Sequence, residues 1–289
     1  MTTRIRALMF VFGLGLYLAS CDPKTEAGGD ATPASKVDPG KPDPKASPDT
    51  KAAQAAATLP AATELLDKAV EAQGGRAKFD AITSLYLEGT TEVSAQKIRG
   101  DMKLWWKDGD FYIEQQMIGI GTQRAGKQGD VIWTEGPING LRKLSGSEAE
   151  QHAWASSPSL PAHWQRYFDK AETTAEREHH GKKVYDVKLT SKTGANVTLS
   201  FDAVSGLQVV QAFKQVTPMG EVPLAVEFDD YRDVDGIKLP HKQVTDLMVA
   251  TATQTLTKVE IGAAVDTSKF AMPTGGTAVV SPPPKSAIP

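Results

Sequence analysis

The fold class follows from the stretch Met102-Lys103-Leu104-Trp105-Trp106-Lys107-Asp108-Gly109-Asp110-Phe111-Tyr112-Ile113-Glu114. Large apolar side chains occupy every second position on both sides of the central Asp108-Gly109, except that Trp105 falls on the otherwise polar side. A period of two is the period of a β-strand, because successive side chains of a strand point to opposite faces. Asp-Gly between two such runs is typical of a tight hairpin turn. The stretch therefore predicts two antiparallel strands that share one apolar face.

The same period of two continues through most of the chain around this hairpin. Turn dipeptides such as Asn139-Gly140 and Asp235-Gly236 separate many of the alternating runs. Short strands joined by hairpin turns favour an antiparallel sheet. Together with the hairpin we expect about ten strands, the others lying near residues 82–88, 131–133, 184–189, 197–201, 207–210, 222–228, 237–239 and 249–261.

Two helical segments accompany the strands. Residues 61–73 place apolar side chains at helical spacing, and Gly74-Gly75 ends the segment. Further on, Ser145 and Glu148 have the spacing of a capping box, and an insertion of two helices follows them. A sheet with one apolar face must cover that face. We therefore predict a mainly β protein whose curved antiparallel sheet is covered on its open side by the N-terminal helix and the helical insertion.

The chain begins like a bacterial lipoprotein precursor. Arg4 and Arg6 precede an apolar run at residues 7–18, and small residues lead to Cys21, the only cysteine of the 289 residues. This order is that of a secretory signal, and the run is shorter than the roughly 20 residues of a membrane-spanning helix. We expect residues 1–20 to be a signal peptide and Cys21 to carry a diacylglycerol group, palmitate being one of its possible acyl chains. The alternative is an ordinary secretory signal with a chance cysteine.

The composition predicts three further parts of the chain. Residues 21–58 comprise the lipidated cysteine and a Pro- and Ala-rich stretch that cannot bury enough apolar surface to fold, so we expect a disordered tether. Residues 59–273 form one domain of generous size. Residues 274–289 are again rich in proline and are expected to be a disordered tail.

The sequence contains no recognisable catalytic motif. The net charge of −3 argues against nucleic acid as a partner. The neighbours His179-His180 would point to opposite faces of a strand, and the following Gly181 favours a solvated turn. Residues 233–236 begin like a calcium loop but place Tyr231 and Lys242 where oxygen ligands are needed. We therefore expect neither enzymatic activity nor a cofactor or metal.

What remains is apolar character in the predicted domain. Large side chains on the strands and on the insertion could line a cavity between sheet and helices, or they could simply fill a core, and the sequence favours neither. The candidates for ligand binding are Met102, Trp106, Phe111, Met117, Trp133, Trp164 and Phe168.

The order of these elements resembles a known family. The resemblance rests on the helix that ends at Gly74-Gly75, the strands at 82–88 and 102–107, Phe201-Asp202-x-x-x-Gly206-Leu207, and the stretch from Phe228 to Pro240. Together they are similar to the outer-membrane lipoprotein-sorting superfamily of LolA and LolB, over nearly all of residues 59–273. The resemblance implies an incomplete β-barrel with helices in its open side and a hydrophobic cavity for acyl chains. The long tether departs from the pattern of the family's membrane-bound receptor, and no functional residue is carried over.

Two functions are consistent with this sequence. The first is a lipid-anchored cell-envelope protein that binds a lipid or lipoprotein acyl chain, in lipoprotein sorting or envelope lipid handling, and that faces the periplasm from either membrane. The second is a non-catalytic scaffold lipoprotein whose partner is an envelope protein or the cell wall. An enzyme with a hidden site is the third and least supported class, because no nucleophile, acid and base are recognisable together.

Replacing Cys21 with Ser should release the protein from the membrane fraction, because a hydroxyl at this position cannot receive the thioether-linked lipid. Fractionation of cells that express the full chain measures this, and Ser47→Ala in the predicted tether serves as the control that stays bound. A Cys21→Ser variant that remains in the membrane fraction would show that the lipoprotein interpretation is wrong.

Overall fold

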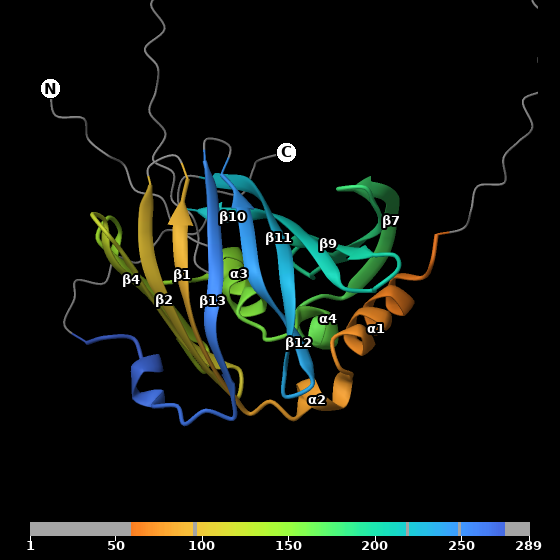
Figure 1. Ribbon diagram of the computed structural model, residues 1–289. Helices are drawn as coiled ribbons and strands as arrows, with labels where there is room; N and C mark the ends of the chain where they lie inside the picture. Colours follow the sequence, from red (N-terminus) through yellow and green to blue (C-terminus); the bar gives the residue numbers. More distant parts are fainter. Residues whose placement is uncertain (1–58, 95–96, 218–219, 248–249, 275–289) are drawn as a thin grey trace, which may run out of the picture. The chain divides into compact units, whose positions relative to one another are not determined.

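The computed structural model describes residues 59–94, 97–217, 220–247 and 250–274 (Figure 1). All of them belong to one of the two units into which the chain divides, and the other unit, residues 19–58, lies outside the described ranges. The predicted signal peptide, Cys21, the tether and the tail beyond residue 274 therefore stay predictions. Among the described residues no helix has the length and apolar character needed to cross a bilayer.

Thirteen strands of the described chain form one antiparallel sheet. Its order is β6-β5-β4-β3-β2-β1-β13-β12-β11-β10-β9-β8-β7, so that β6 and β7 are free edges and the sheet does not close. This confirms the predicted fold class, with thirteen strands in place of about ten. The strands are β1 (Ser84–Val93), β2 (Ile98–Lys107), β3 (Asp110–Met117), β4 (Gly121–Gln128), β5 (Val131–Gly136), β6 (Gly140–Lys143), β7 (Lys170–His179), β8 (Lys182–Thr190), β9 (Asn196–Asp202), β10 (Gln208–Thr217), β11 (Gly220–Val234), β12 (Ile237–Asp246) and β13 (Thr251–Ile261).

The hairpin read from the sequence is the β2–β3 pair. Trp106 lies opposite Phe111, and the register continues without a bulge along both strands. Asp108 and Gly109 both have a positive φ, of 50° and 90°, which is the backbone of the tight turn that Asp-Gly favours. Burial alternates along β2 as predicted, and its buried side chains join the main core.

The opposite face of the same strands carries a second, smaller core. Trp105 and Tyr112 lie 5.5 Å apart between ring centroids, and Tyr112 in turn lies 6.2 Å from Trp133. The C-terminal segment with the short helix η2 (Thr267–Phe270) covers this aromatic row, and the indole N–H of Trp133 donates a hydrogen bond of 2.8 Å to the carbonyl of Phe270. This explains the apolar Trp105 on the otherwise polar side of its strand.

The described residues also form four short α-helices. They are α1 (Ala62–Ala72), α2 (Arg76–Asp80), α3 (Gly146–Ala155) and α4 (Leu160–His163), the last continued by a turn of 3₁₀ helix, η1 (Trp164–Arg166). Of these, α3 and α4 lie against the inner face of the sheet, and α1 and α2 lie towards its lower end in the view of Figure 1. The segment that contains α3, α4 and η1 connects the edge strand β6 to the edge strand β7. It therefore crosses from one edge of the open sheet to the other, as expected for the predicted cover.

The expected capping box at the start of α3 does not form. Ser145 occupies the N-cap position, but its side chain makes no capping hydrogen bond. Glu148 instead forms a buried ion pair with Arg142 of β6, at 2.7 Å between Oε1 and Nη2. Leaving a buried guanidinium without a carboxylate costs more free energy than leaving the helix end without this cap. Glu148 therefore ties α3 to the sheet.

Helix α1 is held by the turns that carry the family resemblance. The ammonium of Lys68 donates to the carbonyl of Ala203 in the β9–β10 turn at 2.6 Å. At the β11–β12 turn, the main-chain N–H of Lys238 donates to the carbonyl of Gln73 at 2.8 Å. Gly74 has a φ of +123°, and a Cβ there would lie 2.3 Å from a carbonyl oxygen of the same turn. The three sequence motifs therefore meet where the helix docks on the sheet.

Lowering the pH should destabilise the domain through His152 of α3. Its ring is fully buried, and burial lowers its pKa to about 4, with smaller opposing effects of the Glu148 and Arg142 charges. The unfolded chain, with a pKa near 6.5, then binds the proton more readily than the folded chain. The contribution of the neutral His152 to the free energy of unfolding is therefore fully present above pH 6.5 and is lost as the pH falls towards 4. Between pH 7 and pH 5 the loss amounts to about 2 kcal/mol.

Urea unfolding at pH 7 and pH 5 measures this change. His152→Leu should remove this part of the pH dependence, whereas His180→Gln, at an exposed position, should leave it in place. An unchanged pH dependence in His152→Leu would contradict the assignment.

Candidate functional site

A pocket of about 140 Å³ lies between the inner face of the sheet and the connection from α3 to α4. The sheet provides one wall, to which strands β1, β2, β10, β11, β12 and β13 contribute. The helical side is formed by the end of α3, by residues 156–159 and by the start of α4. The segment that covers the apolar face therefore leaves part of it uncovered at this place.

The sheet wall of the pocket is apolar along β1, β2 and β13, whereas β10 and β12 also contribute glutamines. Its side chains come from inward positions of the alternating strands, so the pocket and the main core share one surface. Leu87 of β1 and Leu104 of β2 are direct cross-strand neighbours, and Leu85 and Trp106 form the next inward pair. The apolar side chains that define this wall are Leu85, Leu87, Leu104, Trp106, Val226 and Leu256.

Side-chain amides form much of the polar part of the lining, beside the serines of residues 156–159 and the phenol of Tyr231. Gln151 of α3 accepts from the Nε2 group of Gln215 at 2.7 Å and from the main-chain N–H of Val216 at 2.9 Å. Its own Nε2 group donates to the carbonyl of Lys214 at 2.8 Å. These bonds fix the end of α3 to β10. The glutamines that line the pocket are Gln73, Gln151, Gln208, Gln211, Gln215 and Gln243.

Two lining residues carry buried polar atoms that have no hydrogen-bond partner among the described residues. They are Oε1 of Gln73 and the indole Nε1 of Trp154, whose side chains are 7 % and 2 % exposed. A buried polar group without a partner costs about 1–3 kcal/mol. The pocket lining therefore contains one acceptor and one donor that a polar ligand or a water molecule could satisfy.

None of the residues that line this pocket is an aspartate, glutamate, lysine, arginine or histidine. The phenol of Tyr231 is its one ionisable group, and burial raises the pKa of that phenol above its usual value. Tyr231 donates its hydroxyl to the carbonyl of Gln208 at 2.8 Å. The pocket is therefore neutral, and its chemistry is apolar contact combined with amide hydrogen bonds.

The structure separates the seven predicted ligand-binding residues. Trp106 lines the pocket. Trp133 belongs to the small core on the opposite face. The other five are packed in the main core without lining the pocket, namely Met102, Phe111, Met117, Trp164 and Phe168. The domain thus combines a filled core with a pocket, the two arrangements that the sequence left open.

The glutamines are not among the seven side chains predicted from the sequence. The sequence does contain a signal for two of them. Gln215 and Gln243 lie an even number of residues from core-facing neighbours on their strands, so they are expected on the same face. Both are buried, at 4 % and 6 % exposure. Uncharged polar residues at inward positions of otherwise apolar strands indicate that hydrogen-bond partners lie on the inner side of the sheet.

The pocket and sheet define a class of protein, the open antiparallel sheets that hold helices against their inner face. Among solved structures, a LolA superfamily protein from Nitrosomonas europaea matches 74 % of this chain and 98 % of its own, with a TM-score of 0.51 and 12 % identity. A DUF1329 family protein from Desulfovibrio piger matches the same shares, with a TM-score of 0.51 and 13 % identity. No protein-family model matches the sequence, and no curated protein matches it significantly. The resemblance to the LolA superfamily is therefore confirmed for the fold.

Replacing Gln151 with Leu should destabilise the domain by about 2–4 kcal/mol, because it removes three hydrogen bonds and leaves buried partners unsatisfied. Urea unfolding of the full chain in detergent measures the change. Gln116→Leu, on an exposed position of β3, makes the same chemical change and should stay within about 0.5 kcal/mol. Equal effects of the two substitutions would show that the amide bonds of Gln151 contribute nothing specific.

Proposed function

We propose that this chain is a lipid-anchored protein of the bacterial cell envelope that binds a lipid or lipoprotein acyl chain in the pocket between its sheet and α3–α4. The observation that carries the proposal is the lining, in which apolar side chains of the sheet lie beside amides and no charged side chain is present. The LolA-superfamily fold supports it, since the family resemblance implies a cavity for acyl chains. Lipoprotein sorting or envelope lipid handling is the process that this binding would serve.

The polar groups of the pocket specify the chemistry of the ligand further. A fully charged headgroup would find no counter-ion in the lining, and burying an unpaired charge is costly. The carbonyl of a neutral ester or amide could instead accept from the indole N–H of Trp154, and the N–H of an amide could donate to Oε1 of Gln73. Acyl chains joined through such groups occur both in glycerolipids and at acylated N-termini, so the shared chemistry is an acyl chain with its linkage.

The size of the pocket sets a condition on this function. A volume of 140 Å³ is close to that of an engineered cavity of about 150 Å³ that admits benzene, whereas ligand pockets usually measure about 300–1,000 Å³. An acyl chain therefore requires the pocket to widen. Residues 156–159 form a wall outside every helix and strand, so an outward movement of this segment breaks no sheet hydrogen bonds. Each methylene that then leaves water contributes about 0.8 kcal/mol.

The narrow pocket also favours a second candidate, the non-catalytic scaffold lipoprotein. In this alternative the interior only stabilises the fold and binds no ligand, and the partner is an envelope protein or the cell wall. Neither candidate assigns catalysis to the pocket, because its lining offers no side chain that is both ionisable near neutral pH and placed to act as an acid or base.

Binding of a fluorescent fatty acid to the full chain, purified in mild detergent, tests the proposal. Ser157→Trp should weaken binding at least about tenfold, because the indole would occupy space between residues 156–159 and the sheet. Ser147→Trp places the same side chain on the first turn of α3, outside the pocket lining, and should leave binding unchanged. Native mass spectrometry of the protein from envelopes identifies whether the bound molecule is a glycerolipid or an acylated peptide.

Each outcome distinguishes the candidates. Absence of fatty-acid binding and of copurified lipid in the unchanged protein would reject lipid binding and favour the scaffold. Equal binding by Ser157→Trp would place the lipid outside this pocket.

A further inference from the structure

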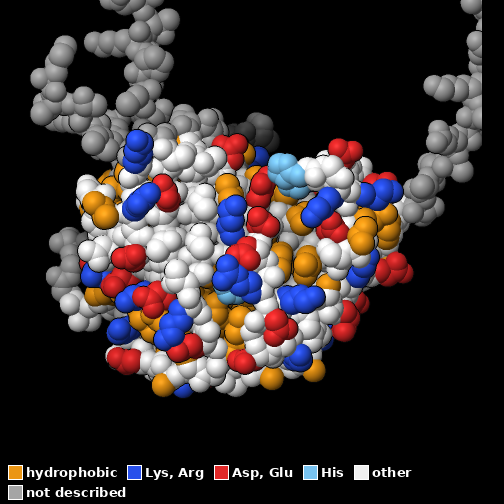
Figure 2. Space-filling model, in the orientation of Figure 1, with side chains coloured by type: hydrophobic (Ala, Val, Ile, Leu, Met, Phe, Trp, Pro, Cys, Tyr) orange, Lys and Arg blue, Asp and Glu red, His pale blue; other side chains and the backbone are white. Residues whose placement is uncertain are grey.

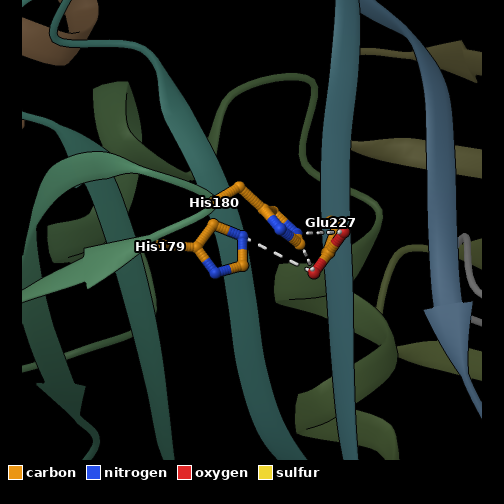
Figure 3. Close-up of side chains that lie close together, drawn as sticks. All are labelled: His179, His180 and Glu227. Carbon is orange, nitrogen blue, oxygen red and sulfur yellow. Dashed lines mark hydrogen bonds and ion pairs between the residues drawn. The ribbon is translucent and has the colours of Figure 1, made fainter.

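His179, His180 and Glu227 lie together on the outer face of the sheet (Figure 3). Nε2 of His180 is 3.2 Å and 3.4 Å from the two carboxylate oxygens of Glu227. Nε2 of His179 lies 3.5 Å from the first of these oxygens. One ligand atom from each of the three residues can be chosen so that all lie within 4.8 Å of one another.

The turn after β7 explains why two neighbouring histidines converge. Adjacent side chains diverge only where both residues belong to a strand. His179 is the last residue of β7, whereas His180 begins the predicted turn and has a φ of +48°. This change of backbone brings the two rings to 4.1 Å between centroids, so the expected divergence does not occur.

Glu227 reaches the histidines from a different part of the sheet. On β11 it lies between Val226 and Phe228, which line the pocket on the inner face, so its side chain points outward. Three strands, β8, β9 and β10, separate β11 from β7 in the sheet. The cluster therefore joins the hairpin of the free edge to the interior of the sheet.

The separations fit a metal ion. Zinc binds histidine nitrogen and carboxylate oxygen at about 2.0–2.2 Å in a tetrahedral arrangement, which places ligand atoms about 3.3–3.5 Å apart. The nitrogen-to-oxygen distances in the cluster, 3.2 and 3.5 Å, are close to this value before any adjustment. Two imidazoles with one carboxylate suit zinc and its neighbours in the transition series better than magnesium or calcium.

The surroundings leave space for the remaining ligands. The cluster borders a groove of about 310 Å³ whose floor includes apolar side chains such as Val184 and Val244. Lys242 also borders it, and Asp229 lies 3.8 Å away from that ammonium and offsets its charge. Figure 2 shows acidic and basic side chains interspersed over this face, so no large field of one sign surrounds the site.

We propose that His179, His180 and Glu227 form a binding site for one Zn²⁺ ion. The ion would clip the β7–β8 turn to β11, and water or a side chain of another molecule would complete its coordination. The site lies on the face opposite the pocket, so the proposal of a zinc site does not depend on the proposal of lipid binding.

Titration of the full chain with Zn²⁺ at pH 7.5, with an affinity tag that contains no histidine and with a chromophoric chelator as competitor, tests this site. We expect one specific ion per chain and a rise in Tm on its addition. His180→Ala and Glu227→Gln should each lower the affinity at least about tenfold and remove the rise in Tm. Glu178→Gln, which removes an exposed carboxylate from the same hairpin, should change neither.

Three results would overturn the proposal. The first is no zinc binding by the unchanged protein. The second is an equal loss of affinity in Glu178→Gln, which would indicate attraction by general surface charge. The third is full retention of binding in both His180→Ala and Glu227→Gln, which would place the ion elsewhere.

Discussion

The structure depends on one constraint: its sheet has an apolar face but does not close on itself. A closed barrel would bury that face by itself, whereas an open sheet must cover it with other parts of the chain. The connection between the two free edges is well placed for this, because a direct path from β6 to β7 crosses the open side. The buried pair of Arg142 and Glu148 fixes the start of this connection to the sheet. Helix α1, docked on two sheet turns, adds its buried side chains to this cover.

The pocket is a consequence of how this cover is built. The cover consists of short helices joined by residues 156–159, and the gap lies where α3 ends. Amides of the lining bond to one another and to the backbone, as in the links between Gln151 and β10. Such links hold the cover without placing a charge inside. The same arrangement that stabilises the cover therefore makes a neutral, partly polar interior.

Features set by neighbouring residues could be predicted from the sequence. Arrangements that depend on residues distant in the sequence could not. The alternation around Asp108-Gly109 gave the β2–β3 hairpin because period and turn are local properties. The capping box failed because the partner of Glu148, Arg142, comes from another element. Aromatic size suggested the pocket lining, yet only Trp106 of the seven candidates lines it, since register and cover decide which inward residue meets empty space. For the histidine pair the turn was expected, but its effect on the two rings depends on the φ of His180.

The free edges of the sheet have a consequence for self-association. An unpaired strand offers its N–H and C=O groups to any other strand, including that of a second copy. At one edge, β6 spans four residues, too short to template a long pairing. At the other edge, β7 carries charge at five of its ten positions, Lys170, Glu172, Glu176, Arg177 and Glu178. An added strand would have to bring its own side chains against this row of charges. The two edges thus disfavour growth of the sheet from copy to copy, and many molecules can stay separate where they are crowded together.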